Sequence, residues 1–534
     1  MVRKEMNLMV DHRTIVGKAK PDGGEKTMNP HNLTLYDMIR QNARLHARRE
    51  AIVFNDVRLS YEEYEKKCHQ VAAGLIREGI IKGDRLGILS HNCDEFMILY
   101  GAAAKIGAIL VPVNWRFQQE EVEYVLRDGS PKIVFAGPDY RRTVMEIAKK
   151  VEAIKEKFTI GGGERTEGFR LFSELYGEAD PGKEFEISAD SGFVIIHTAA
   201  VDGRPRGALL SQANVLFTNW QTMYQYGLTS QDCHVSLLPL FHIAGLATTM
   251  AVMHAGGQNV LLERFDPDLT LRLIEKEKGT LFFNFAPILK NILDKYEQGS
   301  YDISSLRRVS GLDTGETIRR FLKTAPRARY WSGFGQTEVM GVSGGDFIEK
   351  PGSAGRPSPF VRVGLFDEYD REVPPGTPGE ICVRSPSVFL GYWGREEDTA
   401  STFRNGWHHT GDIGRFDEEG YLWYVKRKSQ KELIKPGGEN VYPSEVEKVI
   451  LQHEKVLEVS VIGVRDPEWG EAIKAICVLK PGEILEPRDL IEFVASKIAR
   501  YKKPKYVVVV DSLPKTKDGE IDRDRVKKEH GGMY

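Results

Sequence analysis

Three short stretches of the sequence combine small residues with groups that bind phosphate, sugar or metal. The first, HTAAVDGRPRGALLSQAN, covers residues 197–214 and places glycine and proline as in a tight phosphate-binding turn. The apolar run FVIIHT leads into the turn, and Ser211 is a good N-cap for a following helix. A strand, a glycine loop and a helix in this order point backbone N–H groups at an anion. The loop lacks the GxxxxGK(S/T) pattern, so an ordinary turn is the alternative.

The second stretch, YWSGFGQTEVMG at 330–341, predicts a site for a flat ligand with a phosphate. Gly333 and Gly335 let the backbone approach the ligand closely, and Phe334 between them offers a stacking surface. Thr337 could bond a phosphate oxygen, and Glu338 could hold a magnesium ion. The alternative is a glycine-rich turn with an exposed acid.

The third stretch runs from residue 406 to 447 and predicts a sugar-binding carboxylate. Asp412 lies in a tight Thr-Gly-Asp turn, where its carboxylate could hold two vicinal hydroxyls, and Arg427 follows at the end of an apolar strand. Three independent stretches in this order are unlikely to occur together by accident. Together they predict a site for a nucleotide.

The elements around these stretches predict an α/β fold. Amphipathic helices alternate with β-branched runs such as AIVF, RLGILS, AILVPV and KIVFAG, which is typical of parallel sheets buried on both faces. From about residue 355 to 430, short strands and turns predict a β-rich subdomain. We expect a polar extension at 1–31, a large domain at 32–430 and a small α+β domain at 431–534. The charged join at 426–438 is either a mobile linker or a solvated loop.

Composition excludes several classes of protein. With 534 residues the chain is long enough for two to four domains, and its net charge of −2 gives no reason to expect nucleic acid as a partner. Its five cysteines are widely spaced and form no CxxC pair, which is typical of reduced thiols in a cytoplasmic protein. The most apolar stretch, at 101–113, is too short to span a bilayer. No apolar signal segment occurs near the start.

The three stretches together resemble the AMP-forming adenylating enzymes, which include acyl-CoA synthetases, 4-coumarate ligases, firefly luciferase and nonribosomal adenylation domains. The resemblance covers residues 34–525 and is strongest in GFGQTE, TGD and ELIKPGGENVYPSEVE; LPLFHIAG and GAAAKIGAILVPVN also match. It implies that a carboxylate attacks ATP to give acyl-AMP, and that the CoA thiol then displaces AMP. ATP or AMP, Mg²⁺ and coenzyme A are the implied cofactors, a carboxylic acid is the implied substrate, and a homodimer is possible.

The resemblance also implies a role for individual residues. Phe334 would face adenine, Thr337 would touch the α-phosphate, and Glu338 would bind magnesium. Asp412 and Arg427 would hold the ribose. His242 would line the acyl pocket, with a packed core histidine as the alternative. The small domain would turn about Lys431, although Lys431 comes four positions after Arg427, whereas the family hinge comes two positions after its arginine. Further implied cofactor contacts come from Thr198, Gly203, Arg206, Gly207, Gly333, Gly335, Gln336 and Lys435, and Gly437 and Gly438 would border the pantetheine tunnel.

Two positions depart from the family pattern. The family loop reads Thr-Ser-Gly-Thr-Thr-Gly-x-Pro-Lys-Gly. In this chain three of its hydroxyl residues are replaced, one of them by the acid Asp202. Arg206 keeps the positive charge of the family lysine. In LPKTKDGEIDR, Glu520 replaces the lysine that bridges carboxylate and α-phosphate during adenylation. Reversing a charge about 4 Å from a phosphate changes the interaction by up to ~4 kcal/mol per unit charge at a dielectric near 20.

Three interpretations therefore remain open. The protein is an acyl-CoA synthetase for a fatty or aromatic acid with weakened adenylation, or an enzyme that carries out only the acyl-AMP and CoA half-reaction. The third interpretation is a non-catalytic protein that binds a nucleotide or an acyl-CoA.

Overall fold

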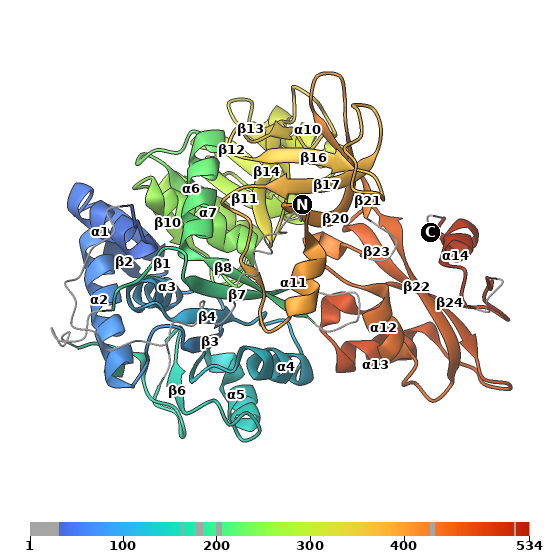
Figure 1. Cartoon of the computed structure of the whole chain (residues 1–534), viewed down its shortest axis with the longest axis horizontal. Coiled ribbons are helices and arrows are strands. Elements are labelled where there is room, and N and C mark those ends of the chain that lie inside the picture. Colours follow the sequence, from blue (N-terminus) through green and yellow to red (C-terminus); the bar gives the residue numbers. More distant parts are fainter. Residues whose placement is uncertain are drawn as a thin grey trace, which may run out of the picture.

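The computed structural model describes residues 31–162, 164–177, 185–198, 205–427, 433–516 and 520–532. In Figure 1 a large body carries three sheets, and a small domain, coloured orange to red, lies on its right side. We use "small domain" for the unit that contains β22–β24 and α12–α14. Asp202, Gly203 and Lys431, which the sequence singles out, lie outside the described residues.

The first sheet has seven strands in the order β18-β8-β7-β4-β3-β5-β6. Strands β3 to β7 pair in parallel, and β8 and β18 add antiparallel pairs at one edge. Its strands are β3 (Arg85–Leu89), β4 (Ile109–Pro112), β5 (Ile133–Ala136), β6 (Glu156–Thr159), β7 (Gly192–Thr198), β8 (Arg206–Ser211) and β18 (Gly391–Tyr392).

The second sheet has nine strands in the order β15-β14-β13-β12-β11-β9-β10-β1-β2. Its central strands are parallel, and antiparallel hairpins close both ends. Its strands are β1 (Glu50–Phe54), β2 (Val57–Ser60), β9 (Cys233–Ser236), β10 (Gln258–Leu261), β11 (Leu281–Phe285), β12 (Arg308–Leu312), β13 (Arg329–Gln336), β14 (Val339–Asp346) and β15 (Arg356–Pro357).

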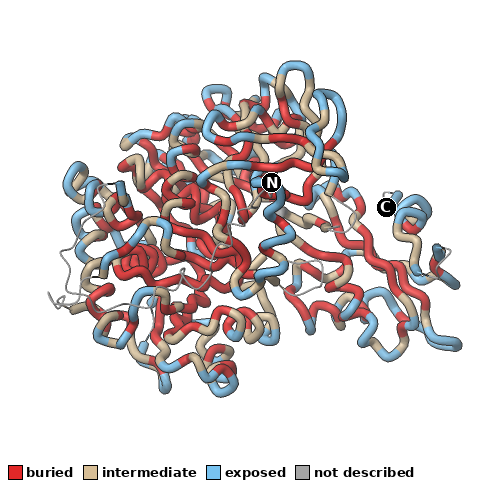
Figure 2. Tube along the Cα trace, viewed as in Figure 1, coloured by how far each residue is buried: buried red, intermediate tan, exposed pale blue. Residues whose placement is uncertain are grey.

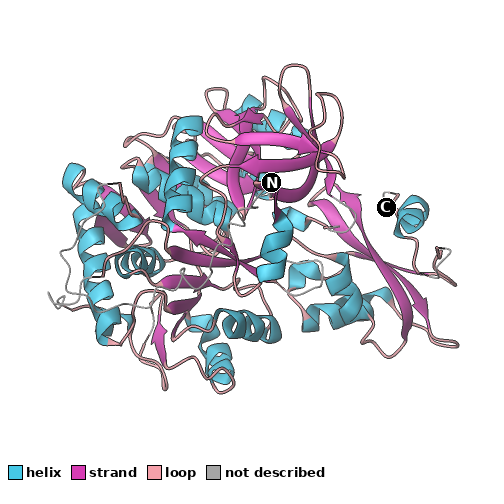
Figure 3. Cartoon of the chain, viewed as in Figure 1, coloured by secondary structure: helices cyan, strands magenta, loops and turns pink. Residues whose placement is uncertain are grey.

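An antiparallel sheet follows in the chain and packs against the end of the second one (Figure 3). It contains β16 (Arg362–Phe366), β17 (Gly379–Arg384), β19 (Phe403–Arg404), β20 (Trp407–Phe416) and β21 (Leu422–Arg427). The small domain contributes β22 (Val456–Asp466), β23 (Gly470–Leu479) and β24 (Tyr506–Val509). The predicted α/β fold with a large domain and a small α+β domain is confirmed.

Helices cover the faces of the sheets, as expected for strands buried on both sides. In the large body they are α1 (Leu35–Leu45), α2 (Tyr61–Arg77), α3 (Asp94–Ile106), α4 (Gln119–Gly129), α5 (Arg141–Ala148), α6 (Gln212–Tyr226), α7 (Ile243–His254), α8 (Pro267–Glu277), α9 (Ile288–Tyr296), α10 (Gly315–Thr324) and α11 (Glu396–Thr402). The small domain has α12 (Pro443–Ile450), α13 (Pro487–Lys497) and α14 (Arg523–His530).

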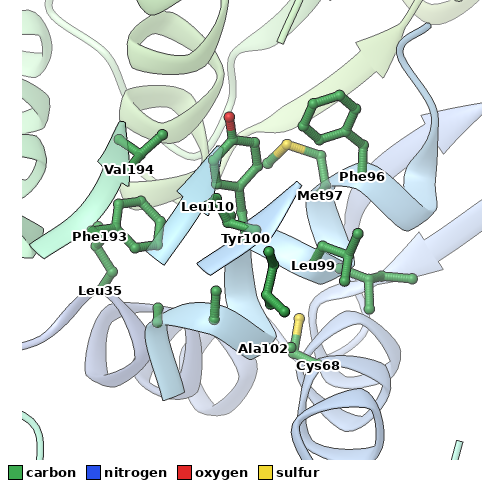
Figure 4. Close-up of a cluster of buried hydrophobic side chains, with 14 of the residues drawn as sticks. Leu35, Cys68, Phe96, Met97, Leu99, Tyr100, Ala102, Leu110, Phe193 and Val194 are labelled. Atoms are coloured by element: carbon green, nitrogen blue, oxygen red, sulfur yellow. The ribbon is translucent and has the colours of Figure 1, made fainter. Parts of the chain in front are cut away.

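Helix α3 is apolar on nearly all sides because it lies inside the largest core cluster. Figure 4 shows Tyr100 of α3 beside Phe193, and Figure 2 shows this region as continuously buried. The Tyr100 hydroxyl donates to the Leu240 carbonyl, so its one polar atom is satisfied. The apolar stretch at 101–113 is therefore the end of a core helix and the buried strand β4. Within the described residues, no helix is long and apolar enough to cross a membrane.

The hairpin of β7 and β8 corrects one expectation from the sequence. The loop after FVIIHT was expected to lead directly into a helix, but the run RGALLS forms β8, which pairs with β7 in antiparallel register. Ser211 does cap α6, since its side chain accepts the Asn214 N–H. The helix N-terminus nevertheless lies one strand away from the loop, because the apolar residues of β8 complete the buried sheet. The expected layout of a strand, a glycine loop and a helix is therefore wrong at this loop.

All five cysteines are free and buried: Cys68, Cys93, Cys233, Cys382 and Cys477. Burial raises the pKa of the Cys477 thiol to about 12. The prediction of unpaired, buried thiols is confirmed.

Candidate functional site

The turn between β13 and β14 presents the Thr337 and Glu338 side chains to a large cavity, the first of two described here. Both residues are buried, and both line that cavity together with Phe334. The close pairing of β13 with β14 requires the glycines, since a side chain at Gly333 would come within 2.6 Å of the Ser343 carbonyl oxygen. The glycine-rich turn is therefore part of a cavity wall, and Glu338 is not the exposed acid of the alternative interpretation.

Asp412 faces this turn from β20 and is buried. Its Oδ1 lies 3.0 Å from Arg427 Nε, and Arg427 Nη2 donates to Oδ2 at 3.3 Å. Gln336 Nε2 donates to the same Oδ2 at 3.4 Å. The register of β20 with β21 places Asp412 directly opposite Arg427, so the hairpin itself creates the ion pair. The structure thus brings together the three separate sequence stretches at one cavity.

A cluster of metal-type ligands behind this turn has a structural role. Glu380, Cys382 and His409 have ligand atoms within 4.8 Å of one another. Arg404 Nη2 lies 2.8 Å from His409 Nδ1, so a fixed cation already occupies the position where a metal would bind. Glu380 Oε1 accepts the Gly411 N–H at 2.9 Å, and this bond fixes the backbone that carries Asp412.

Arg206 and Tyr392 connect the start of β8 to Glu338. The Arg206 guanidinium lies 4.2 Å from the centre of the Tyr392 ring, and its Nη1 lies 3.4 Å from Asp398 Oδ1. The Tyr392 hydroxyl donates to Glu338 Oε1 at 2.7 Å. Burial, with the Glu338 charge, raises the pKa of Tyr392 well above its ordinary value, so the phenol stays a donor. Sequence reasoning did not select Tyr392, although the aromatic GYW run at 391–393 was a usable signal.

The oxygen atoms of Glu338 and Thr337 suit a magnesium ion, which prefers carboxylate and other oxygen ligands. Both side chains line the cavity, and among the described residues the hydrogen bond that Glu338 Oε1 accepts comes from the neutral phenol of Tyr392. The residues present therefore fit the implied ion.

The part of the cavity farther from Asp412 is lined mostly by apolar and aromatic groups. Its walls come from the ends of α6, α7, β11, β12 and β13, and they include Tyr226, Ala244, Ala247, Phe283, Phe285, Leu312 and Trp331. Arg308 lies behind the wall, 5.1 Å from the Trp331 ring and 5.5 Å from the Tyr226 ring. The aromatic side chains of this wall were not singled out from the sequence.

His242 lines the same cavity and packs against its aromatic wall. It caps α7, and its Nδ1 accepts the Ala244 N–H at 3.1 Å. Its ring lies 5.8 Å from the Phe285 ring, edge to face. Burial lowers the pKa of His242, so the ring is neutral with its hydrogen on Nε2. The residue is therefore a wall of the cavity as well as a packed side chain.

The small domain closes the cavity from the outside. Lys435, Asn440 and Tyr442 line it beside Asp412, and burial lowers the pKa of Lys435. Gly437 adopts φ 58°, and a side chain there would meet the Trp469 ring at 2.7 Å and the Ala286 carbonyl oxygen of the large body at 3.2 Å. Gly438 ends the same short turn, Pro436–Gly438. Only glycine fits Gly437 in this docked arrangement.

A second cavity lies between the large body and the small domain. It shares Thr198, His242, Thr337 and Asn440 with the first one, so the two spaces meet at these residues. Its own walls include Pro112, Asn114, Phe117, Val125, His197, Pro205, Glu439, Tyr501 and Lys502.

Glu520 is the predicted site residue that the structure keeps apart. It is exposed, its carbonyl accepts the Thr516 N–H, and it does not line either cavity. The first cavity is lined by four other predicted residues: Thr198, Arg206, Gly335 and Gln336. Gly207 packs against β7 instead, and a side chain at this position would come within 2.5 Å of Ile195. Gly207 therefore supports the hairpin and does not face the cavity.

The sequence matches two family models over most of its length. Residues 39–393 match the AMP-binding enzyme model, and residues 445–520 match the AMP-binding enzyme C-terminal domain. The indoleacetate–CoA ligase of Aromatoleum aromaticum is 32% identical, with 93% of this chain and 98% of that protein covered. The chain therefore belongs to the AMP-binding enzyme family, and it groups there with acid–thiol ligases of the acyl-CoA ligase type.

Solved structures agree with this assignment. One from Rhodopseudomonas palustris CGA009, assigned provisionally as a long-chain-fatty-acid CoA ligase, is 44% identical with a TM-score of 0.70 and covers 75% of this chain and all of its own. The o-succinylbenzoate CoA synthetase of Bacillus subtilis is 26% identical, and the match covers 94% of this chain and all of that one. A double mutant bound with its product analogue OSB-NCoA gives a TM-score of 0.81, and the complex with AMP gives 0.67.

Proposed function

We propose that this protein forms an acyl-CoA thioester from a carboxylic acid through an acyl-adenylate, and that the described arrangement serves the thioester step. The observation that carries the proposal is the junction of the two cavities at Thr198, His242, Thr337 and Asn440. An acyl-adenylate in the first cavity would present its carbonyl carbon at this junction. The second cavity would bring a thiol to the same point.

The residue roles that the family resemblance implies are compatible with the same geometry. Asp412 and Arg427 would hold the ribose, Phe334 would face adenine, and Thr337 with Glu338 and its magnesium ion would hold the α-phosphate. Gly437 and Gly438 would border the channel for the pantetheine arm of CoA. The higher similarity to the structure bound with OSB-NCoA than to the AMP complex supports this arrangement as the thioester-forming one.

The acyl wall favours an aromatic acid over a long alkyl chain. Tyr226, Phe283, Phe285 and Trp331 give flat surfaces on several sides of the pocket, and rings pack well against rings. Relatives described as acting on indoleacetate and as a feruloyl-CoA synthase agree with this choice.

We further propose that adenylation is the weaker half-reaction. Glu520 stands where the family lysine assists adenylation, and Asp202 adds an acid to the phosphate loop. Arg206, which replaces the loop lysine, is already paired with Asp398 and stacked on Tyr392. Each ~1.4 kcal/mol lost from the transition state slows the step tenfold.

The test separates the two half-reactions. Pyrophosphate release is measured with MgATP and a panel of aromatic and fatty acids, and thioester formation is measured with pre-made benzoyl-, phenylacetyl- and hexanoyl-adenylate plus CoA. We expect the second rate to exceed the first, and Glu520→Lys to raise pyrophosphate release at least tenfold. Glu454→Lys makes the same charge change at another exposed site of the small domain and should leave it unchanged. Rapid pyrophosphate release by the unmodified protein would contradict weakened adenylation, and failure of every adenylate would contradict the whole proposal.

A further inference from the structure

The second cavity contains a histidine–aspartate pair that none of the roles above uses. His197 is the penultimate residue of β7, and its side chain is 2% exposed. Its Nε2 lies 2.9 Å from Asp128 Oδ2, on the last turn of α4. His197 pairs with Gly207 in the β7–β8 hairpin, and the missing side chain of Gly207 leaves room for the imidazole, whose Nε2 is 3.3 Å from the Cβ position.

The hydrogen bond to Asp128 fixes the hydrogen on the ring. A carboxylate accepts, so the neutral imidazole carries its hydrogen on Nε2 and has a lone pair on Nδ1. Within the described residues, His197 Nδ1 is buried and has no hydrogen-bond partner. A buried acceptor without a partner is costly, which favours a function that supplies a donor from a ligand.

His242, the other histidine of the second cavity, has the opposite arrangement. Its Nδ1 accepts the Ala244 N–H, so its Nε2 carries the hydrogen and can only donate. Of the two imidazoles that line this cavity, His197 is thus the one that can accept a proton.

We propose that His197 is the base that removes the thiol proton of CoA, with Asp128 as its positioning residue. The inference depends on the proposed thioester reaction. The proton of the S–H group moves to His197 Nδ1 while the sulfur forms a bond to the acyl carbonyl carbon. The bond from that carbon to the phosphate oxygen breaks, and AMP leaves with the electron pair. Asp128 stabilises the imidazolium that forms, and the proton then passes to solvent.

Two other charged groups that line this cavity, Lys502 and Glu439, are already engaged. Lys502 Nζ lies 2.6 Å from Glu121 and 2.5 Å from Glu445. Glu439 is paired with Arg116 at 3.2 Å. The carboxylate that contacts His197 is that of Asp128, and its negative charge stabilises the ring when the ring is protonated.

The experiment measures single-turnover thioester formation from a pre-made acyl-adenylate and CoA between pH 6 and 9. We expect His197→Gln to slow this step about a hundredfold at pH 7, the usual size of a general-base effect. The deficit should shrink as the pH rises toward 9, because a growing fraction of the CoA thiol is then already ionised and needs no base. Asp128→Asn should slow the step less, and His46→Gln, a change beside Tyr61 away from both cavities, should leave it unchanged.

AMP affinity, measured by calorimetry, reports whether the variants keep the folded nucleotide site. A deficit that is the same at every pH, or that comes with an equal loss of AMP affinity, would overturn the role of His197 as a base. An unchanged rate in His197→Gln would overturn it as well. If the unmodified protein makes no thioester from any adenylate, it is the proposed function that fails.

Discussion

At the scale of single residues, the proposed nucleotide part of the site contains a buried carboxylate with several donors. The Asp412 carboxylate accepts hydrogen bonds from the Arg427 guanidinium and the Gln336 amide, and all three residues line one cavity. Since a buried charge is stable only with such partners, the site is pre-organised before any ligand binds.

Replacing Asp412 with Asn removes this charge with little change in volume. We expect AMP binding to weaken about ten- to a hundredfold, since a hydrogen bond to a charged group contributes about 1.5–3 kcal/mol. Titration calorimetry with AMP measures the effect. Asp417→Asn, in the turn that joins the same two strands, is the control, because Asp417 bonds Trp423 and does not line the cavity. Equal AMP affinity in Asp412→Asn would show that this carboxylate does not hold the ribose.

Residue patterns predicted the cavity wall where the motif lies within one turn or hairpin. Thr337, Glu338 and Asp412 are such cases, because local backbone geometry decides where they point. Trp331 and Lys502 could not be found in this way, since their position depends on which distant elements pack together. The exposed position of Glu520 depends on how the small domain docks, and a motif carries no information about that.

At the scale of elements, the pairing of β9 with β10 buries an imidazole. His234 lies opposite Asn259 in the parallel register, and the two side chains are 3.0 Å apart. Burial lowers the pKa of His234 to about 4. The folded state therefore favours the neutral ring, while the unfolded chain binds a proton near pH 6.5.

This difference predicts how acid weakens the fold. The contribution of the neutral His234 ring to the free energy of unfolding is complete above pH 6.5, and it is lost as the pH falls from 6.5 toward 4. Between pH 6 and 4.5 one proton separates the two states, which gives a slope of about 1.4 kcal/mol per pH unit in the free energy of unfolding. Urea unfolding of His234→Asn should show a slope smaller by that amount in this range and a parallel curve above pH 7. Equal slopes from pH 6 to 4.5 would contradict the burial argument.

The periodicity of apolar residues predicted most of the order of strands and helices. The runs AIVF, RLGILS, AILVPV, KIVFAG and FVIIHT all became strands, because β-branched residues between amphipathic helices have few other options. The β8 strand was missed because its six residues follow the loop directly and lead into a capped helix. A local sequence pattern also does not predict how the parallel strands divide between the two sheets.

At the scale of the whole molecule, a buried lysine holds the small domain to the large body. Lys502, on the small domain, is 2% exposed at its side chain and bonds Glu121 of α4 and Glu445 of α12. Glu121 also accepts the Ala499 N–H at 2.9 Å. One carboxylate of the large body therefore satisfies two donors of the small domain, and this arrangement exists only while the domains are docked.

Glu121→Gln should loosen the docking, while its remaining amide oxygen can still accept the Gln118 N–H that caps α4. The loss weakens two buried hydrogen bonds, at a cost of about 1–3 kcal/mol. We expect a larger radius of gyration by small-angle scattering and thioester formation from a supplied adenylate at least tenfold slower, with pyrophosphate release unchanged. Glu123→Gln, on the same helix but in exposed pairs with Arg127 and Lys150, should have almost no effect. Identical scattering curves for the Glu121 variant and the unmodified protein would show that this contact does not hold the domains.

The burial of all five native thiols has a practical consequence for studying such a motion. A maleimide dye needs an accessible thiolate, so the native protein should remain almost unlabelled under non-denaturing conditions. One cysteine introduced on the surface of each domain would then carry donor and acceptor fluorophores without background. Energy transfer between the two dyes could follow the opening and closing of a single molecule during turnover.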